Sequence, residues 1–175
     1  MIFQGISFPD GMVVIEGAFP GYQPDTMVWR DSQMAIMAER FAQGQARFKV
    51  YADKIYSNSI LVTAAYNCRN YRFGLHDWQI RINRLMSDIR EGVEWSFGKI
   101  IIRNKFVSYG KSMKIQASPV SKYYHMAILL ANAHTCMYGC QQTSYFGVVA
   151  TDVNEYFDQK RSCRYRLIYL SQKLI

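Results

Sequence analysis

Residues 83–106 read NRLMSDIREGVEWSFGKIIIRNKF, a stretch whose spacing predicts a helix with polar and apolar side chains on one face. On a helix, side chains spaced three and four apart share one face. That face would carry Asn83, Ser87, Arg90, Glu94, Phe97, Gly98 and Ile101. Glu94 follows Val93 and precedes Trp95, and a carboxylate among apolar neighbours is costly to desolvate unless it is paired or holds a cation. Two interpretations stay open: a functional carboxylate, or an Arg90–Glu94 i,i+4 ion pair worth tenths of a kcal/mol.

The composition is that of one globular domain. The chain has 175 residues, of which 50% are hydrophobic, and its net charge is +8. So basic a chain favours nucleic acid, an anionic membrane surface or an acidic partner. No apolar run approaches the roughly 20 residues that cross a bilayer. The four cysteines are scattered, which indicates a reducing compartment, so we expect an intracellular, soluble protein without a membrane association.

The first half of the chain predicts a sheet with helices. Residues 1–8 and 12–19 are apolar runs joined by Pro9-Asp10-Gly11, a strong hairpin signal. The first run begins at the initiator methionine, which suggests a domain entered after its start. Asp25 is expected to cap a single helix that extends to Ala42. The other elements that we predict are strands at 48–52 and 59–66 and helices at 75–104, 120–138 (with Pro119 as its first residue) and 153–159.

Two carboxylates stand where catalytic groups are often found. Asp53 ends the strand 48–52, and the carboxyl ends of strands are where α/β sheets usually present their chemistry. Glu94 lies 41 positions later on the long helix. Two such carboxylates with a third would hold Mg²⁺ or Mn²⁺ for two-metal phosphoryl chemistry. Spacing alone is a weak signal for such a site.

Several motifs resemble the DDE superfamily of transposase-derived endonucleases, in particular its PIF/Harbinger-like group. The resemblance extends to about Phe157. Its matching pieces are Phe3-Gln4-Gly5-Ile6 with Pro9-Asp10-Gly11, residues 17–25, Tyr51-Ala52-Asp53-Lys54-Ile55-Tyr56, the 83–98 face that ends Val93-Glu94-Trp95-Ser96-Phe97-Gly98, residues 129–136 and Tyr145-Phe146-Gly147.

The resemblance implies a ribonuclease-H-like fold, that is, a mixed sheet flanked by helices with a D–D–E metal triad. Asp53 would be the second Asp of the triad, with Ala52 in place of the family's usual glycine, and Glu94 would be its Glu. Arg90 would fix the Glu94 rotamer or meet phosphate. It also implies a transposable-element origin, a DNA substrate, a nuclear location and, in many members, a separate DNA-binding protein.

One departure from the family pattern decides how active the chain should be. The family's first Asp lies on the first strand of the sheet, upstream of the Phe-Gln-Gly strand with which this chain begins. We therefore expect an α/β, ribonuclease-H-like sheet that lacks its first strand. Residues 1–157 would form a truncated catalytic domain and 158–175 a basic tail. Without the first Asp, weak metal binding and poor cleavage are expected; the alternative is an inactive DNA- or protein-binding module.

Other candidates are explained more simply. Asp10 belongs to the hairpin turn, and Asp25 is explained by helix capping. Residues 81–122 carry nine Lys or Arg against three acids, so this half could face a polyanion, with Lys111 and Lys114 on the backbone, or be a solvated face. The basic tail after residue 158 could stack on single strands, although a solvated end is simpler.

Overall fold

The computed structural model describes residues 1–42, 49–71, 74–108, 119–158 and 169–170. The chain opens with the predicted hairpin of strands β1 (Ile2–Ser7) and β2 (Val13–Phe19), which pair in antiparallel register. Gly11 takes a φ of 81° at the turn, a conformation that favours glycine. Asp10 closes the turn by accepting a hydrogen bond from the Met12 amide at 3.1 Å. The hairpin prediction is confirmed, and the Asp10 carboxylate stabilises its turn.

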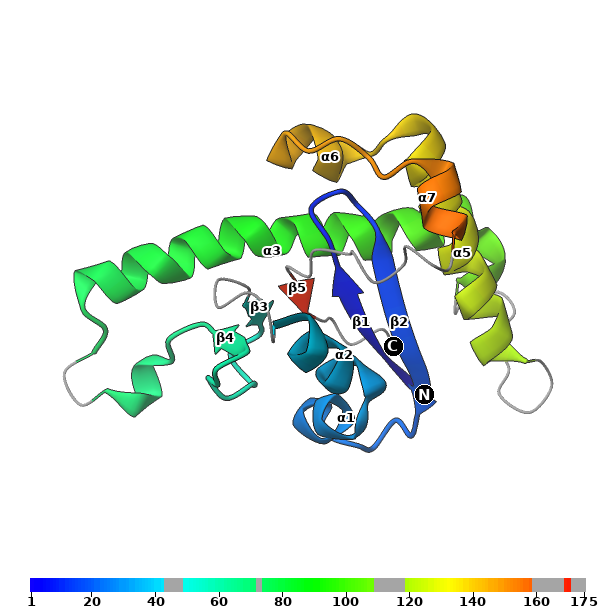
Figure 1. Cartoon of the computed structure of the whole chain (residues 1–175). Helices are drawn as coiled ribbons and strands as arrows, with labels where there is room; N and C mark the ends of the chain where they lie inside the picture. The colour runs from blue at the N-terminus through cyan, green and yellow to red at the C-terminus, as the bar shows by residue number, and fades with distance from the viewer. Residues whose placement is uncertain (43–48, 72–73, 109–118, 159–168, 171–175) are drawn as a thin grey trace.

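Five strands form one mixed sheet with the order β2-β1-β5-β3-β4. Strands β3 (Val50–Ala52) and β4 (Val62–Ala64) are parallel to each other. The short strand β5 (Tyr169–Leu170) runs antiparallel to β1 and parallel to β3. Two residues from the stretch predicted to be a basic tail therefore lie in the middle of the sheet, between β1 and β3 (Figure 1).

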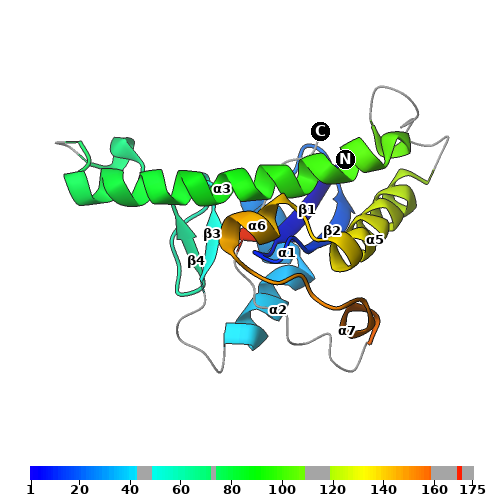
Figure 2. The same cartoon turned by 90° about the horizontal axis from the view of Figure 1, so that it is seen from above.

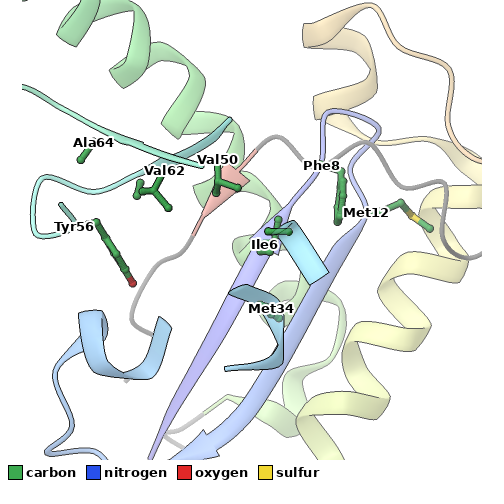
Figure 3. Packing of buried hydrophobic residues seen from close by; sticks show 10 residues of the cluster. Ile6, Phe8, Met12, Met34, Val50, Tyr56, Val62 and Ala64 are labelled. Carbon is green, nitrogen blue, oxygen red and sulfur yellow. The ribbon is translucent and has the colours of Figure 1, made fainter. Parts of the chain in front are cut away.

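Helices cover both faces of the sheet, as Figure 2 shows from above, and the alternation along β1 separates two cores. Ile6 faces the core on the side of the short N-terminal helices, where it packs with Met34 and Val50 (Figure 3). Phe3 faces the opposite core, which the long helices α3 (Asp77–Arg103) and α5 (Val120–Tyr138) provide. The prediction of an α/β fold is confirmed.

The helix predicted from Asp25 to Ala42 is instead two helices, α1 (Asp25–Asp31) and α2 (Gln33–Ala42). Ser32 breaks it: its backbone is extended, and its hydroxyl donates to the Trp29 carbonyl at 2.8 Å. The carboxylate of Glu16 then accepts from the Met34 amide at 3.2 Å, at the start of α2. The capping role expected of Asp25 is wrong, because Pro24 occupies the N-cap and Asp25 is the first helical residue.

The two long helices match their predicted positions to within two residues, although Pro119 is the N-cap of α5 and not its first helical residue. Gly92 lets α3 approach the Phe146 ring, since a Cβ there would lie 3.0 Å from a ring carbon. Gly98 has no such neighbour. The remaining elements are the 3-10 turns η1 (Cys68–Asn70) and η2 (Lys105–Val107) and the short helices α6 (Gln141–Phe146) and α7 (Val153–Phe157). Among the described helices, none is long and apolar enough to cross a membrane.

Candidate functional site

Asp53 lies directly after β3, on the side of the sheet that α3 covers. Val50 and Ala52 belong to the core under α2, whereas Tyr51 packs against the core under α3. Because side chains alternate along a strand, the direction of Tyr51 is also that of Asp53. The backbone turns at once, with the Tyr56 amide donating to the Asp53 carbonyl at 2.9 Å and the Lys54 amide to its carboxylate at 2.7 Å. The end of β3 thus presents a carboxylate toward α3.

Arg90 brings the two predicted carboxylates together. Its Nη1 lies 3.2 Å from Oδ1 of Asp53, and its Nε lies 3.9 Å from Oε1 of Glu94. The ion-pair interpretation of the helix face is thereby confirmed, whereas a functional role of Glu94 stays a prediction. The i,i+4 ion pair exists, and the same guanidinium also contacts an acid that is 37 positions earlier in the chain. One cation thus neutralises two carboxylates from different elements at one place on the surface.

The expectation that Glu94 is pressed into apolar surroundings is wrong. Its side chain is 53% exposed, and those of Arg90 and Asp53 are 48% and 28% exposed. The buried stripe of α3 passes beside Glu94 and contains Val93 and Phe97. The Glu94 carboxylate is consequently accessible to water, so burial does not oblige it to have an ionic partner. A cation can reach this carboxylate pair from solvent.

A buried polar triangle fixes the segment of α3 that carries Glu94. Ser7, Ser96 and Gln142 are each exposed by no more than 1%. The hydroxyls of Ser7 and Ser96 lie 2.7 Å apart, Ser96 donates to Oε1 of Gln142, and Nε2 of Gln142 donates to Ser7 at 3.0 Å. Every member is satisfied within the triangle, which joins β1, α3 and α6. Sequence analysis missed it, because no local pattern relates Gln142 to the other two.

Asn83 supports the structure at the other end of the expected polar face. Its amide accepts from the Tyr66 amide at 2.8 Å and donates to the Tyr66 carbonyl at 2.9 Å. Ser87, on the same face, is exposed. The polar residues expected on one face of α3 therefore have different roles. Asn83 binds the backbone of Tyr66, whereas Arg90 and Glu94 belong to the candidate site.

The comparisons with known proteins identify the family. The model of a family described as DDE superfamily endonuclease matches residues 3–132, a span that includes Asp53, Arg90 and Glu94. The chain belongs to the DDE superfamily of endonucleases. The resemblance seen in the sequence is thereby confirmed. No curated protein and no solved structure matches the chain.

The donor set of this DDE chain fits a hard cation. Carboxylate oxygens are the ligands that Mg²⁺ takes, and proteins often hold Mg²⁺ through only one or two carboxylates, with water and substrate phosphates completing the shell. Asp53 and Glu94 supply such a pair on one side of the molecule. Within the described ranges, no group of three or more His, Cys, Asp and Glu side chains is placed to hold an ion. By type, the two carboxylates are nevertheless ligands that such an ion takes.

The basic residues of this DDE chain do not all face solvent. Lys99 is largely buried, donates to the Gly11 carbonyl and, at 2.8 Å, to the Thr135 hydroxyl, and its pKa is lowered by desolvation. It ties α3 to the hairpin and to α5 and is not available to a polyanion. Arg81 and Arg84 are exposed on α3. Lys111 and Lys114, the predicted backbone contacts, lie outside the described residues.

Proposed function

We propose that this chain is a DNA nuclease domain in which Asp53 and Glu94 hold a divalent cation, Mg²⁺ or Mn²⁺. The observation that carries the proposal is the double contact of Arg90, which brings a carboxylate from the end of β3 beside one from α3. Membership of a family of endonucleases gives the reaction class, cleavage of phosphodiesters. When bound, the cation supplies Lewis-acid stabilisation of phosphoryl oxygens and activation of water.

The chain's own residues would divide the remaining work. Asp53 and Glu94 would hold the cation. Arg90 neutralises the two acids. Its guanidinium would also suit a phosphate of the substrate, because its planar fork of donors matches phosphate geometry. Because all three side chains are partly exposed, a DNA backbone can approach them without a large opening of the structure.

The sheet supports a ribonuclease-H-like domain that lacks a strand. Its mixed strand directions and the helices on both faces agree with that fold. On its inner side, β1 pairs with β5 only through Ile6 and Ser7, although β1 has six residues.

This proposal includes the expected impairment. With two carboxylates in place of three, the chain should bind one cation weakly and cleave slowly, because two-metal chemistry needs a further ligand. We retain residues 1–157 as the catalytic domain and 158–175 as a basic tail, of which Tyr169 and Leu170 pair with the sheet. A nuclear location and a separate DNA-binding partner also remain part of the proposal.

Nicking of supercoiled plasmid DNA in Mn²⁺ tests the function. We expect slow nicking by the chain and its loss in Asp53→Asn and Glu94→Gln. The control is Glu91→Gln, which removes an exposed acid from the same helix and should nick at the wild-type rate. Equal nicking by Asp53→Asn and wild type would contradict the proposal. A rapid, metal-dependent reaction that needs Asp53 would contradict the impairment alone.

The second candidate function is a DNA-binding module without catalysis. It is favoured by the net charge of +8 together with the absence of a third ligand among the described residues. Its signature would be binding to DNA that weakens steeply with salt, needs no divalent cation and is not followed by cleavage. Plasmid retardation at several salt concentrations, measured with and without EDTA, separates the two functions.

A further inference from the structure

Three aromatic rings meet at the N-terminal end of α3, outside the candidate site. The ring of Tyr66 lies between the other two, with its centroid 5.4 Å from Trp78 and 6.5 Å from Tyr71, and both contacts are edge-on. Trp78 is 53% exposed and Tyr71 is 37% exposed. We call Tyr66, Tyr71 and Trp78 the aromatic platform. Trp78 is one of three tryptophans, and its exposure is unusual for a residue that is highly buried on average.

Polar contacts hold the backbone at several points of the platform. Asn83 makes both backbone hydrogen bonds to Tyr66. Asn67 accepts from the Arg69 amide at 3.1 Å and so caps η1. At the start of α3, the His76 amide donates to the Gln79 side chain at 2.9 Å. A surface whose backbone is already hydrogen-bonded loses less conformational entropy on binding, which favours its use as a docking surface.

The charges around the platform are mostly positive. One exposed arginine, Arg69, lies in the chain between Tyr66 and Tyr71. Two more, Arg81 and Arg84, lie on the first two turns of α3, which begins with the exposed acid Asp77. Exposed apolar rings surrounded by several positive charges are a poor match for an apolar groove of a protein partner. Aromatic faces combined with arginine are what proteins use to stack unpaired bases and to hold the adjoining phosphates.

The position of the platform suits a substrate that passes the candidate site. Trp78 and Glu94 lie on the same helix, 16 positions apart, which at 1.5 Å per residue is about 24 Å along its axis. At 3.4 Å per nucleotide of duplex DNA, this is about seven base pairs. The N-terminal part of α3 extends beyond the β4 edge of the sheet in both views (Figures 1 and 2).

We propose that the aromatic platform binds unpaired DNA bases, so that the chain grips single-stranded or opened DNA at one end of α3. The inference rests on the proposed action on DNA, but it assigns a separate role to residues that do not contact the candidate site. The rings stack on bases of any sequence, and the arginines neutralise the backbone on either side.

Fluorescence anisotropy of labelled oligonucleotides tests this role. The probes are oligo(dT) of about 20 nucleotides, which exceeds typical single-strand site sizes, and a duplex of the same length. Because one of the rings that would stack on bases is removed, Trp78→Ala should weaken oligo(dT) binding by roughly tenfold. Duplex binding should change less than about twofold, and Trp78→Phe should retain most of the affinity for oligo(dT).

Two further variants separate a loss of base stacking from a general effect on the chain. Tyr22→Ala removes a tyrosine that is 90% exposed and lies outside the platform, and it should leave both affinities unchanged. Tyr71→Ala tests the platform independently should Trp78→Ala alter the circular dichroism spectrum. Wild-type affinity for oligo(dT) in both Trp78→Ala and Tyr71→Ala, with duplex binding intact, would overturn the inference and leave the proposed function standing. Failure of the wild-type chain to bind either probe at low salt would overturn both.

Discussion

Replacing Asn132 by alanine should remove the side chain that closes the open edge of the sheet. Strand β2 is outermost in the sheet, next to β1, so the outward backbone groups of Val13 have no partner strand among the described residues. Asn132 of α5 supplies the partner: its Oδ1 accepts from the Val13 amide at 3.0 Å, and its Nδ2 donates to the Val13 carbonyl at 2.8 Å. Both residues are almost completely buried. The side-chain amide thus replaces a neighbouring strand.

The size of the effect follows from the groups left behind. Asn132→Ala leaves a buried amide and a buried carbonyl of Val13 without their partner, and each such group costs about 1–3 kcal/mol. A third hydrogen bond, from Nδ2 to the Tyr156 hydroxyl at 3.1 Å, is lost as well. Allowing for partial access of water at the edge, we expect the free energy of unfolding to fall by about 2–4 kcal/mol. Asn132→Asp should not restore it, because a carboxylate oxygen would face the Val13 carbonyl.

Urea denaturation followed by circular dichroism measures this change. Tyr156→Phe removes the third hydrogen bond alone and should cost about 1 kcal/mol. Asn70→Ala, at an exposed position, should stay within about 0.5 kcal/mol of the wild type. Equal stability of Asn132→Ala and Asn70→Ala, or a loss in Tyr156→Phe as large as that in Asn132→Ala, would contradict this role of Asn132.

Three further changes test other parts of the structure. Tyr124→Phe should raise the free energy of unfolding by about 1 kcal/mol, because the buried Tyr124 hydroxyl has no hydrogen-bond partner among the described residues. Burial raises the Tyr124 pKa above its ordinary value of 10.0, so above that pH the folded state keeps a proton that the unfolded state releases. The free energy of unfolding should therefore fall as the pH rises above 10.0, and it should fall less in Tyr124→Phe. Denaturation at several pH values measures this difference. Gly98→Ala should stabilise α3 by about 0.5–1 kcal/mol, whereas Gly92→Ala should not, because its Cβ would meet the ring of Phe146 at 3.0 Å; thermal unfolding compares the two. Arg90→Ala should alter stability by less than about 1 kcal/mol, since its ion pairs are partly exposed, but should tighten Mn²⁺ binding in a calorimetric titration because the competing cation is gone; unchanged or weaker Mn²⁺ binding would contradict the role given to Arg90.

The elements with strong local signals could be predicted from the sequence. The Asp-Gly turn between two apolar runs determines the hairpin, and the apolar spacing of α3 and α5 places these helices to within two residues. The break at Ser32 could not be predicted, because the Glu16 carboxylate that accepts a hydrogen bond from the first turn of α2 lies on β2. The helix propensity of the local sequence does not reflect a contact with a distant strand.

The candidate site was only partly predictable for the same reason. Asp53, Arg90 and Glu94 could be named from their motifs, but the periodicity of α3 does not determine which side of it meets the sheet. Packing turns Val93 and Phe97 inward and leaves Glu94 at the surface. The contact between Arg90 and Asp53 and the triangle around Gln142 join distant segments, and these require the folded chain.

The most direct test of the account is a calorimetric titration of the chain with Mn²⁺. We expect a single weak site that is lost in both Asp53→Asn and Glu94→Gln and is retained in Glu91→Gln, because two carboxylates from separate elements would share one ion. Unchanged Mn²⁺ binding in the two variants would contradict it and would show that these carboxylates do not form a metal site.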